Sequence, residues 1–230
     1  MPGATFRRSR SFRWGVASAF MLAETWGALY YLGRTWGSTS EERQRTLPGD
    51  AIVERPAIVT DHAIDVEAPA ERTWPWLVQM GRGRGGWYTH RWVDRLLFPA
   101  NGPSAEAVLP QFQQLAAGDT ILDGPPETGC FFTVERLEPD RALVLRSHTH
   151  LPPQLLNRPG VALDCTWTFV LEPLSAERTR FHFRSRITAR PWWLVATYRL
   201  FLVPADFVMA RSMCRGVKER AERSRGVAGG

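Results

Sequence analysis

The sequence predicts an α+β fold, with helices packed against a single antiparallel sheet and an additional apolar helix before the domain. Three observations support this prediction. Five segments between residues 120 and 189 have the composition of strands and are separated by turn-forming residues. A long segment near the C-terminus has apolar residues at helical spacing. The chain of 230 residues, 44% hydrophobic and 23% charged, has a globular composition, which excludes a disordered, fibrous or polytopic membrane protein.

The N-terminal segment is basic and then apolar. Arginines precede a stretch from Trp14 to Gly33 whose one charged residue is Glu24. A stretch of this length could cross a bilayer, although a carboxylate near the centre is costly there. It could also lie on a membrane surface or on the domain itself. We therefore expect three regions: 1–47 as an N-terminal helix and connector, 48–225 as the domain, and 226–230 as a disordered tail.

The first part of the domain has the pattern of one strand followed by helices. Apolar residues alternate over 58–67, which predicts a strand. Pro69 then suits the first turn of a helix, and the glycines of 81–86 predict a loop after that helix. Two further helical stretches are expected over 91–98 and 104–115.

The second part of the domain has the pattern of an antiparallel sheet. In the last two predicted strands, apolar residues such as Trp167 and Phe183 alternate with polar ones such as Asp164 and Arg184. Each strand should therefore have one buried face and one face in water. A final helix is expected from Pro204 to about Arg225, because its apolar residues form a stripe. The strands are expected at 120–123, 130–137, 142–150, 162–172 and 179–189.

Several motifs resemble those of a known superfamily. The run IDVEAPAERTWPWLVQMG at 64–81, RGGWY at 84–88, LAAGD at 115–119 and the ending at 207–222 are similar to bacterial START-like (SRPBCC) proteins. The branch they resemble is related to polyketide cyclase/dehydrase and lipid-transport proteins. The resemblance covers roughly residues 48–225. It implies a helix-grip architecture, in which a curved antiparallel sheet wraps a long C-terminal helix around an apolar cavity.

The resemblance implies binding or transport of a hydrophobic small molecule, such as a lipid or polyketide, without strong catalysis. Apolar burial would supply the affinity, and one or two polar groups would fix the orientation. Two alternatives stay open: a cyclase/dehydrase-type enzyme with an acid–base residue in the same cavity, and a membrane-tethered interaction module whose cavity is filled by side chains. The expected ligand-binding residues are Trp87, Tyr88, Cys165, Trp167, Phe169, Phe181, Phe183, Ser185, Ile187 and Met213.

Histidines are the candidates for acid–base or metal chemistry. His62 falls on the apolar face of its strand and is the candidate catalytic residue, although such a histidine is more often a hydrogen-bonded core group. His148 and His150 alternate on a predicted strand, so both should point the same way and could hold a metal with a third ligand such as His62, His90 or Asp164. Their face looks like the solvated one, and we therefore expect no metal and no cofactor.

Charge and the remaining apolar segment bear on partners. The net charge is +6, but Lys218 is the one lysine among 29 Lys and Arg residues, and the arginines are scattered, so we expect no nucleic-acid partner.

The run from Trp192 to Leu202 could be a lid, a membrane contact or packing for the N-terminal helix. Any membrane contact is expected through Trp14 to Gly33 and Trp192 to Leu202. Three widely spaced cysteines argue for a cytoplasmic or membrane-associated protein rather than a disulfide-rich secreted one.

Overall fold

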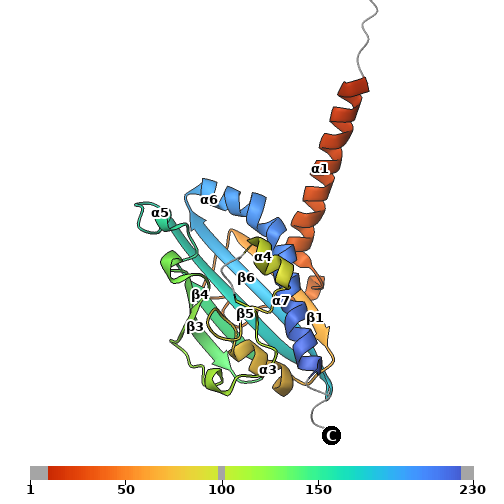
Figure 1. The fold of residues 1–230 in the computed structure, drawn as a ribbon. Coiled ribbons are helices and arrows are strands. Elements are labelled where there is room, and N and C mark those ends of the chain that lie inside the picture. Colours follow the sequence, from red (N-terminus) through yellow and green to blue (C-terminus); the bar gives the residue numbers. More distant parts are fainter. Residues whose placement is uncertain (1–9, 98–101, 224–230) are drawn as a thin grey trace, which may run out of the picture.

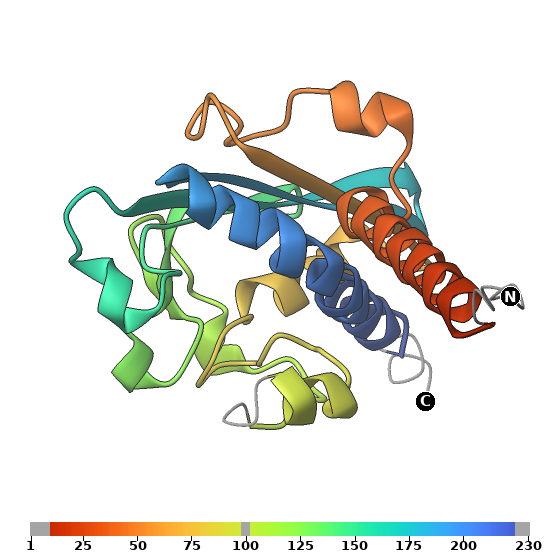
Figure 2. The same ribbon diagram turned by 90° about the horizontal axis from the view of Figure 1, so that it is seen from above.

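The chain folds into a six-stranded antiparallel sheet that carries its long C-terminal helix on one face and an N-terminal segment on the other (Figure 1 and Figure 2). The computed structural model describes residues 10–97 and 102–223. The predicted tail at 226–230 lies outside the described residues. The strands are β1 (Ile58–Val66), β2 (Thr120–Leu122), β3 (Phe131–Glu138), β4 (Ala142–Ser147), β5 (Ala162–Ser175) and β6 (Arg178–Arg190). The helices are α1 (Arg10–Thr35), α2 (Ser40–Gln44), α3 (Ala70–Val78), α4 (Arg91–Leu97), α5 (Pro153–Leu156), α6 (Trp192–Thr197) and α7 (Val203–Arg223), with short 3₁₀ turns η1 (Pro110–Phe112) and η2 (Pro126–Thr128) and a π-helical turn η3 (Tyr198–Leu202).

The sheet has the strand order β1-β6-β5-β4-β3-β2, and each neighbouring pair is antiparallel. The prediction of an α+β, helix-grip fold is confirmed by this sheet and by α7, which lies across it (Figure 1). Alternation made the strands predictable, because apolar residues on one face of β5 and β6 pack in the core beneath the helices. The rings of Phe169 and Phe183 stack there with centroids 5.0 Å apart.

One predicted helix is absent. The segment 104–115 contains only η1, because the loop before it takes the hydrogen-bonding groups that a helix would need. The Gln79 side chain donates to the carbonyl of Ala107 at 3.2 Å and accepts from the amide of Leu109 at 2.8 Å. Arg84 also donates to the carbonyl of Phe112. The 104–115 segment is thereby fixed against the glycine loop at 81–86 rather than coiled on itself.

The C-terminal helix is longer than predicted, since α6, η3 and α7 form one run from Trp192 to Arg223. Pro204 was expected to begin this helix but lies inside it. A proline has no amide hydrogen, so the carbonyl of Leu200, four residues earlier, loses its usual donor. The indole nitrogen of Trp26 on α1 donates to that carbonyl instead, at 3.0 Å. The proline therefore creates an attachment point for the N-terminal helix.

At its other end α7 lies very close to the rest of the domain. A Cβ atom on Gly216 would lie 2.0 Å from the carbonyl oxygen of Tyr88, so only glycine fits there. Cys214, Val217 and Ala221 of the same helix are fully buried. The C-terminal half of α7 is therefore packed directly on the core, with no space beneath it.

The middle of the second face of β5 and β6 is not exposed to water, and the prediction of a wet face is wrong there. Residues 38–57, orange in Figure 2, cover it on the side opposite α7. Arg184 is 2% exposed and its guanidinium bonds the carboxylates of Asp61 and Asp50, both at 2.7 Å. It also donates to the carbonyls of Glu42 and Arg45 in the covering segment. Alternation alone could not reveal this layer, because a buried and fully bonded arginine has the same sequence pattern as a solvated one.

Replacing Arg184 with methionine should lower the free energy of unfolding by about 3–5 kcal/mol, because Asp61 would be left buried without its cation. Chemical denaturation of the full chain measures this change. The matched control is Arg178→Met, whose side chain is 46% exposed in its ion pair with Asp65. The control should cost no more than about 1 kcal/mol. Equal effects of the two substitutions would contradict the buried network.

Candidate functional site

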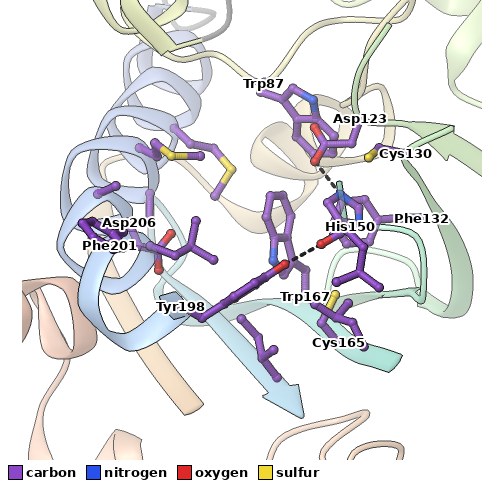
Figure 3. Close-up of a pocket in the computed structure, with 18 of the residues that line it drawn as sticks. Trp87, Asp123, Cys130, Phe132, His150, Cys165, Trp167, Tyr198, Phe201 and Asp206 are labelled. Atoms are coloured by element: carbon purple, nitrogen blue, oxygen red, sulfur yellow. Dashed lines mark hydrogen bonds and ion pairs between the residues drawn. The ribbon is translucent and has the colours of Figure 1, made fainter. Parts of the chain in front are cut away.

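A cavity of about 650 Å³ lies between the sheet and the N-terminal half of the long helix (Figure 3). Its walls come from β3, β5 and β6, from the loops around Trp87, Asp123 and His150, and from the run α6–η3–α7. Most lining side chains are aromatic, aliphatic or sulfur-containing. A volume of this size is typical of small-molecule sites.

The structure brings six of the ten predicted ligand-binding residues to this cavity and leaves four outside its lining. The six that line it are Trp87, Cys165, Trp167, Phe183, Ile187 and Met213. The four that do not are Tyr88, Phe169, Phe181 and Ser185, all of them buried.

The separation follows from how α7 sits on the sheet. Tyr88 packs against α7 near Gly216, where no space remains, and its hydroxyl donates to the carbonyl of Trp76 at 2.9 Å. Phe181 stacks with Phe169 in the filled part of the core. The cavity begins only where the helix departs from the sheet. Strand alternation identified the correct face but not the part of it that lies under the cavity.

One end of the cavity carries a histidine–carboxylate pair that the sequence did not predict. The Nε2 atom of His150 lies 2.7 Å from a carboxylate oxygen of Asp123, and its Nδ1 atom lies 2.7 Å from the Ser147 hydroxyl. The imidazole ring rests on Phe132, with centroids 4.3 Å apart. The hydroxyl of Tyr198 on η3 donates to the backbone carbonyl of His150. Burial raises the pKa of Tyr198, which keeps that hydroxyl protonated as a donor.

The expectation that His148 and His150 point the same way is wrong. The strand β4 ends at Ser147, and Thr149 then bonds the backbone of Phe131 through its hydroxyl. His148 is left outside the cavity, 58% exposed, with Nδ1 3.6 Å from Asp164. The sequence signal that was missed is the pair of turn segments after Leu122 and after Ser147. They follow β2 and β4, the two strands on either side of β3, and both strands end near the start of β3.

A second carboxylate reaches the cavity from the helix. Asp206 of α7 accepts a hydrogen bond from the Thr60 hydroxyl at 3.0 Å and lies 3.2 Å from Nε2 of His62. His62 itself is fully buried behind Asp206 and stacks on Phe183, with ring centroids 6.0 Å apart. It does not line the cavity. His62 therefore points inward, as strand alternation predicted, but Asp206 rather than His62 lines the cavity.

The three cysteines are free thiols. Burial, with a further contribution from nearby aspartates, raises the pKa of Cys165 to about 12, and burial raises that of Cys214 as well. Neither thiol forms a thiolate near neutral pH, so neither has the character of a nucleophile. Within 10–97 and 102–223, no group of three His, Cys, Asp or Glu side chains is placed to hold a metal ion.

Comparison with known proteins finds solved structures that align with most of this chain at low sequence identity. No family model matches the chain, and no curated protein matches it. Among solved structures, a protein from Mesorhizobium loti aligns with 73% of this chain and 98% of its own at 15% identity and a TM-score of 0.42. A hypothetical protein from Helicobacter pylori aligns with 76% of this chain and 95% of its own at 11% identity and a TM-score of 0.47. BexL, a di-domain ARO/CYC protein from the BE-7585A biosynthetic pathway, aligns with 74% of this chain and 48% of its own at 17% identity and a TM-score of 0.39.

The helix-grip architecture expected from the sequence is the one that this chain has, as its own sheet order and C-terminal helix show. A fold of this kind hosts many functions, so function must be argued from the cavity and its residues.

Thiol labelling should distinguish the three cysteines in the native protein. At pH 8 a thiol with a pKa of about 12 is ionised in only about one molecule in ten thousand. Iodoacetamide should therefore modify half-buried Cys130 first and leave Cys165 and Cys214 intact until the protein is unfolded. Mass spectrometry of the digested protein reads out each site, and Cys130→Ser should abolish native labelling. Native modification of Cys165 at the rate of Cys130 would contradict the geometry of the cavity wall.

Proposed function

We propose that this protein binds a hydrophobic small molecule in the cavity between its sheet and the α6–η3–α7 helix. The observation that carries the proposal is a space of about 650 Å³ with a largely apolar lining and a few polar groups at its edges. An apolar ligand that buries about 300 Å² would gain about 7 kcal/mol before the costs of ordering are subtracted.

The open volume argues against the alternative in which side chains fill the cavity. Trp87, Phe132 and Trp167 pack on one another, with ring centroids 4.6–6.1 Å apart, and still leave the space beside them free. The enzyme alternative draws support from the pairs His150–Asp123 and His62–Asp206 beside that space, since such pairs can transfer protons. Both nitrogens of His150 are engaged by protein groups, and His62 lies behind Asp206. This arrangement suits holding a ligand better than reacting with it.

An exposed apolar patch adjoins the cavity and suggests where the ligand enters. The large apolar side chains exposed on α1, α6 and η3, here called the apolar patch, are Met21, Leu22, Trp26, Tyr31, Trp192, Trp193, Leu200, Phe201 and Leu202. Trp192 is 79% exposed and Phe201 is 66% exposed. Phe201 and Leu202 belong both to the patch and to the lining of the cavity.

We infer that the apolar patch rests on a lipid bilayer surface and that the ligand passes between membrane and cavity there. Tryptophan and tyrosine favour the boundary between headgroups and acyl chains. The exposed arginines Arg190 and Arg199 flank the patch and would favour anionic lipids. The run Trp192–Arg223 is the one helix in the described part of the chain that is long and apolar enough to cross a membrane. Its second half is the packed helix α7, which favours surface contact by the first half.

A bound ligand should be detectable directly. Native mass spectrometry of the full chain, followed by organic extraction, should show a co-purified apolar molecule of defined mass. Ala205→Phe places a ring in the cavity wall and should weaken binding of a neutral fluorescent probe, N-phenylnaphthylamine, by about tenfold or more. Ala176→Phe, in the exposed turn between β5 and β6, is the matched control and should bind normally. A ligand-free mass together with no probe binding would contradict the proposal.

Membrane contact should depend on the apolar patch. The full chain should co-sediment with vesicles that contain phosphatidylglycerol. The double variant Trp192→Glu, Phe201→Glu should lower the bound fraction about tenfold, because each substitution removes an aromatic ring that the membrane would bury. The control is Leu174→Glu, an equally apolar side chain, 51% exposed, at the opposite end of the β5–β6 hairpin. A wild-type protein that stays in solution would refute the membrane contact. Patch-dependent dimers in light scattering would also refute it and would show the patch to be an interface between copies.

A further inference from the structure

The charge of the cavity wall is one-sided. Among the described residues, its lining includes the carboxylates of Asp123 and Asp206 and neither an arginine nor a lysine. Figure 3 shows the two aspartates on opposite sides of the space, one on the helix and one beside His150. The chain as a whole has more basic than acidic residues, 29 Lys and Arg against 23 Asp and Glu. The wall of the cavity differs from the rest of the protein in having acidic residues but no arginine or lysine.

Each of these carboxylates has only one oxygen engaged. The Oδ2 atom of Asp123 pairs with His150, and the Oδ2 atom of Asp206 pairs with Thr60 and His62. Within the described ranges, the Oδ1 atom of neither aspartate has a hydrogen-bond partner. A carboxylate oxygen only accepts hydrogen bonds, and with side chains 21% and 19% exposed these aspartates can each accept one from a molecule in the cavity.

Three of the hydroxyl and thiol donors along the wall are used within the protein. Tyr198 donates to the carbonyl of His150, Cys130 to that of Thr149, and Thr197 to that of Trp193. The indole nitrogen of Trp87, beside Asp123, is buried and has no hydrogen-bond partner. The cavity therefore presents open acceptors, while the donors of Tyr198, Cys130 and Thr197 face the protein.

We propose that the cavity selects apolar molecules that carry a hydrogen-bond donor, as a hydroxyl or amino group, over those that carry a carboxylate, with Asp123 and Asp206 as the selecting residues. This inference rests on the proposed ligand-binding function. A donor group would meet the open Oδ1 atoms, whereas a carboxylate would face like charges with no arginine or lysine in the wall to offset them. Because the aspartates lie on opposite sides, molecules with a donor at each end fit best.

The negative charges of both aspartates contribute to the pKa of neighbouring thiols. Burial is the main cause of the raised pKa of Cys165, the charge of Asp164 adds to it, and the charge of Asp123 makes a smaller contribution. Burial likewise raises the pKa of Cys214, and the charge of Asp206 contributes to it. A negative potential that disfavours a thiolate at these positions would disfavour a ligand carboxylate in the same space.

Three ligands of one chain length test the proposal on the full-length protein. Decylamine, decanol and decanoate each compete with N-phenylnaphthylamine at neutral pH, and the fluorescence gives their dissociation constants. Decylamine and decanoate are the critical pair, since both carry a hydrated charge. We expect decylamine to bind at least about tenfold more tightly than decanoate, and decanol also to bind more tightly than decanoate. Asp123→Asn and Asp206→Asn should each reduce the ratio between the pair by about threefold or more, since each keeps the shape and removes the charge.

The control is Glu172→Gln, which removes a carboxylate that lies outside the cavity and pairs with Arg45. Its ratio should equal that of the wild type. Thermal unfolding shows whether each variant is folded, and if Asp206→Asn is not, Asp123→Asn decides alone. Decanoate binding as tightly as decylamine, or a ratio unchanged in the folded cavity variants, would overturn the selectivity while leaving ligand binding intact. Failure of all three ligands and of the probe to bind would overturn the proposed function and the selectivity with it.

Discussion

The structure depends on how its last helix is held against the sheet. At Gly216 the helix touches the carbonyl of Tyr88 so closely that no other residue would fit. Toward its N-terminal half the contacts with the sheet side are polar: Asp206 bonds Thr60 and His62, and Tyr198 bonds the carbonyl of His150. The helix packs tightly at one end and is held through hydrogen bonds of its side chains at the other, and the cavity is the space between the helix and the sheet at that second end.

The same arrangement accounts for the exposed surface. The run α6–η3–α7 lines the cavity on its inner side, and on its outer side α6 and η3 leave Trp192, Leu200 and Phe201 exposed. Phe201 and Leu202 are exposed while also lining the cavity. The attachment of Trp26 to the carbonyl freed by Pro204 adds α1 to this surface. Phe201 and Leu202 thus belong both to the lining of the cavity and to the apolar patch, which links the proposed binding of an apolar molecule to the proposed contact with lipid.

Much of the fold could be predicted from the sequence because strand alternation and the helical stripe depend on local spacing. The cavity face of β5 and β6 followed from the same alternation, through Trp167 and Phe183. What escaped prediction depends on contacts between distant segments. The pair His150–Asp123 exists because Thr149 bonds Phe131 and ends β4 early, and the burial of Arg184 depends on the covering segment. Neither contact leaves a periodic signal.

A crystal structure of the full-length protein, purified without added ligand, tests the central claim most directly. If the helix is held off the sheet as described, the space bounded by Trp167, Met213 and Phe201 should contain continuous density for an apolar molecule, with the bonds from Asp206 to Thr60 and from Tyr198 to His150 in place. A structure in which Phe201 and Leu202 have moved in to fill the space against Trp167 would contradict the account, because the helix would then need no ligand beneath it.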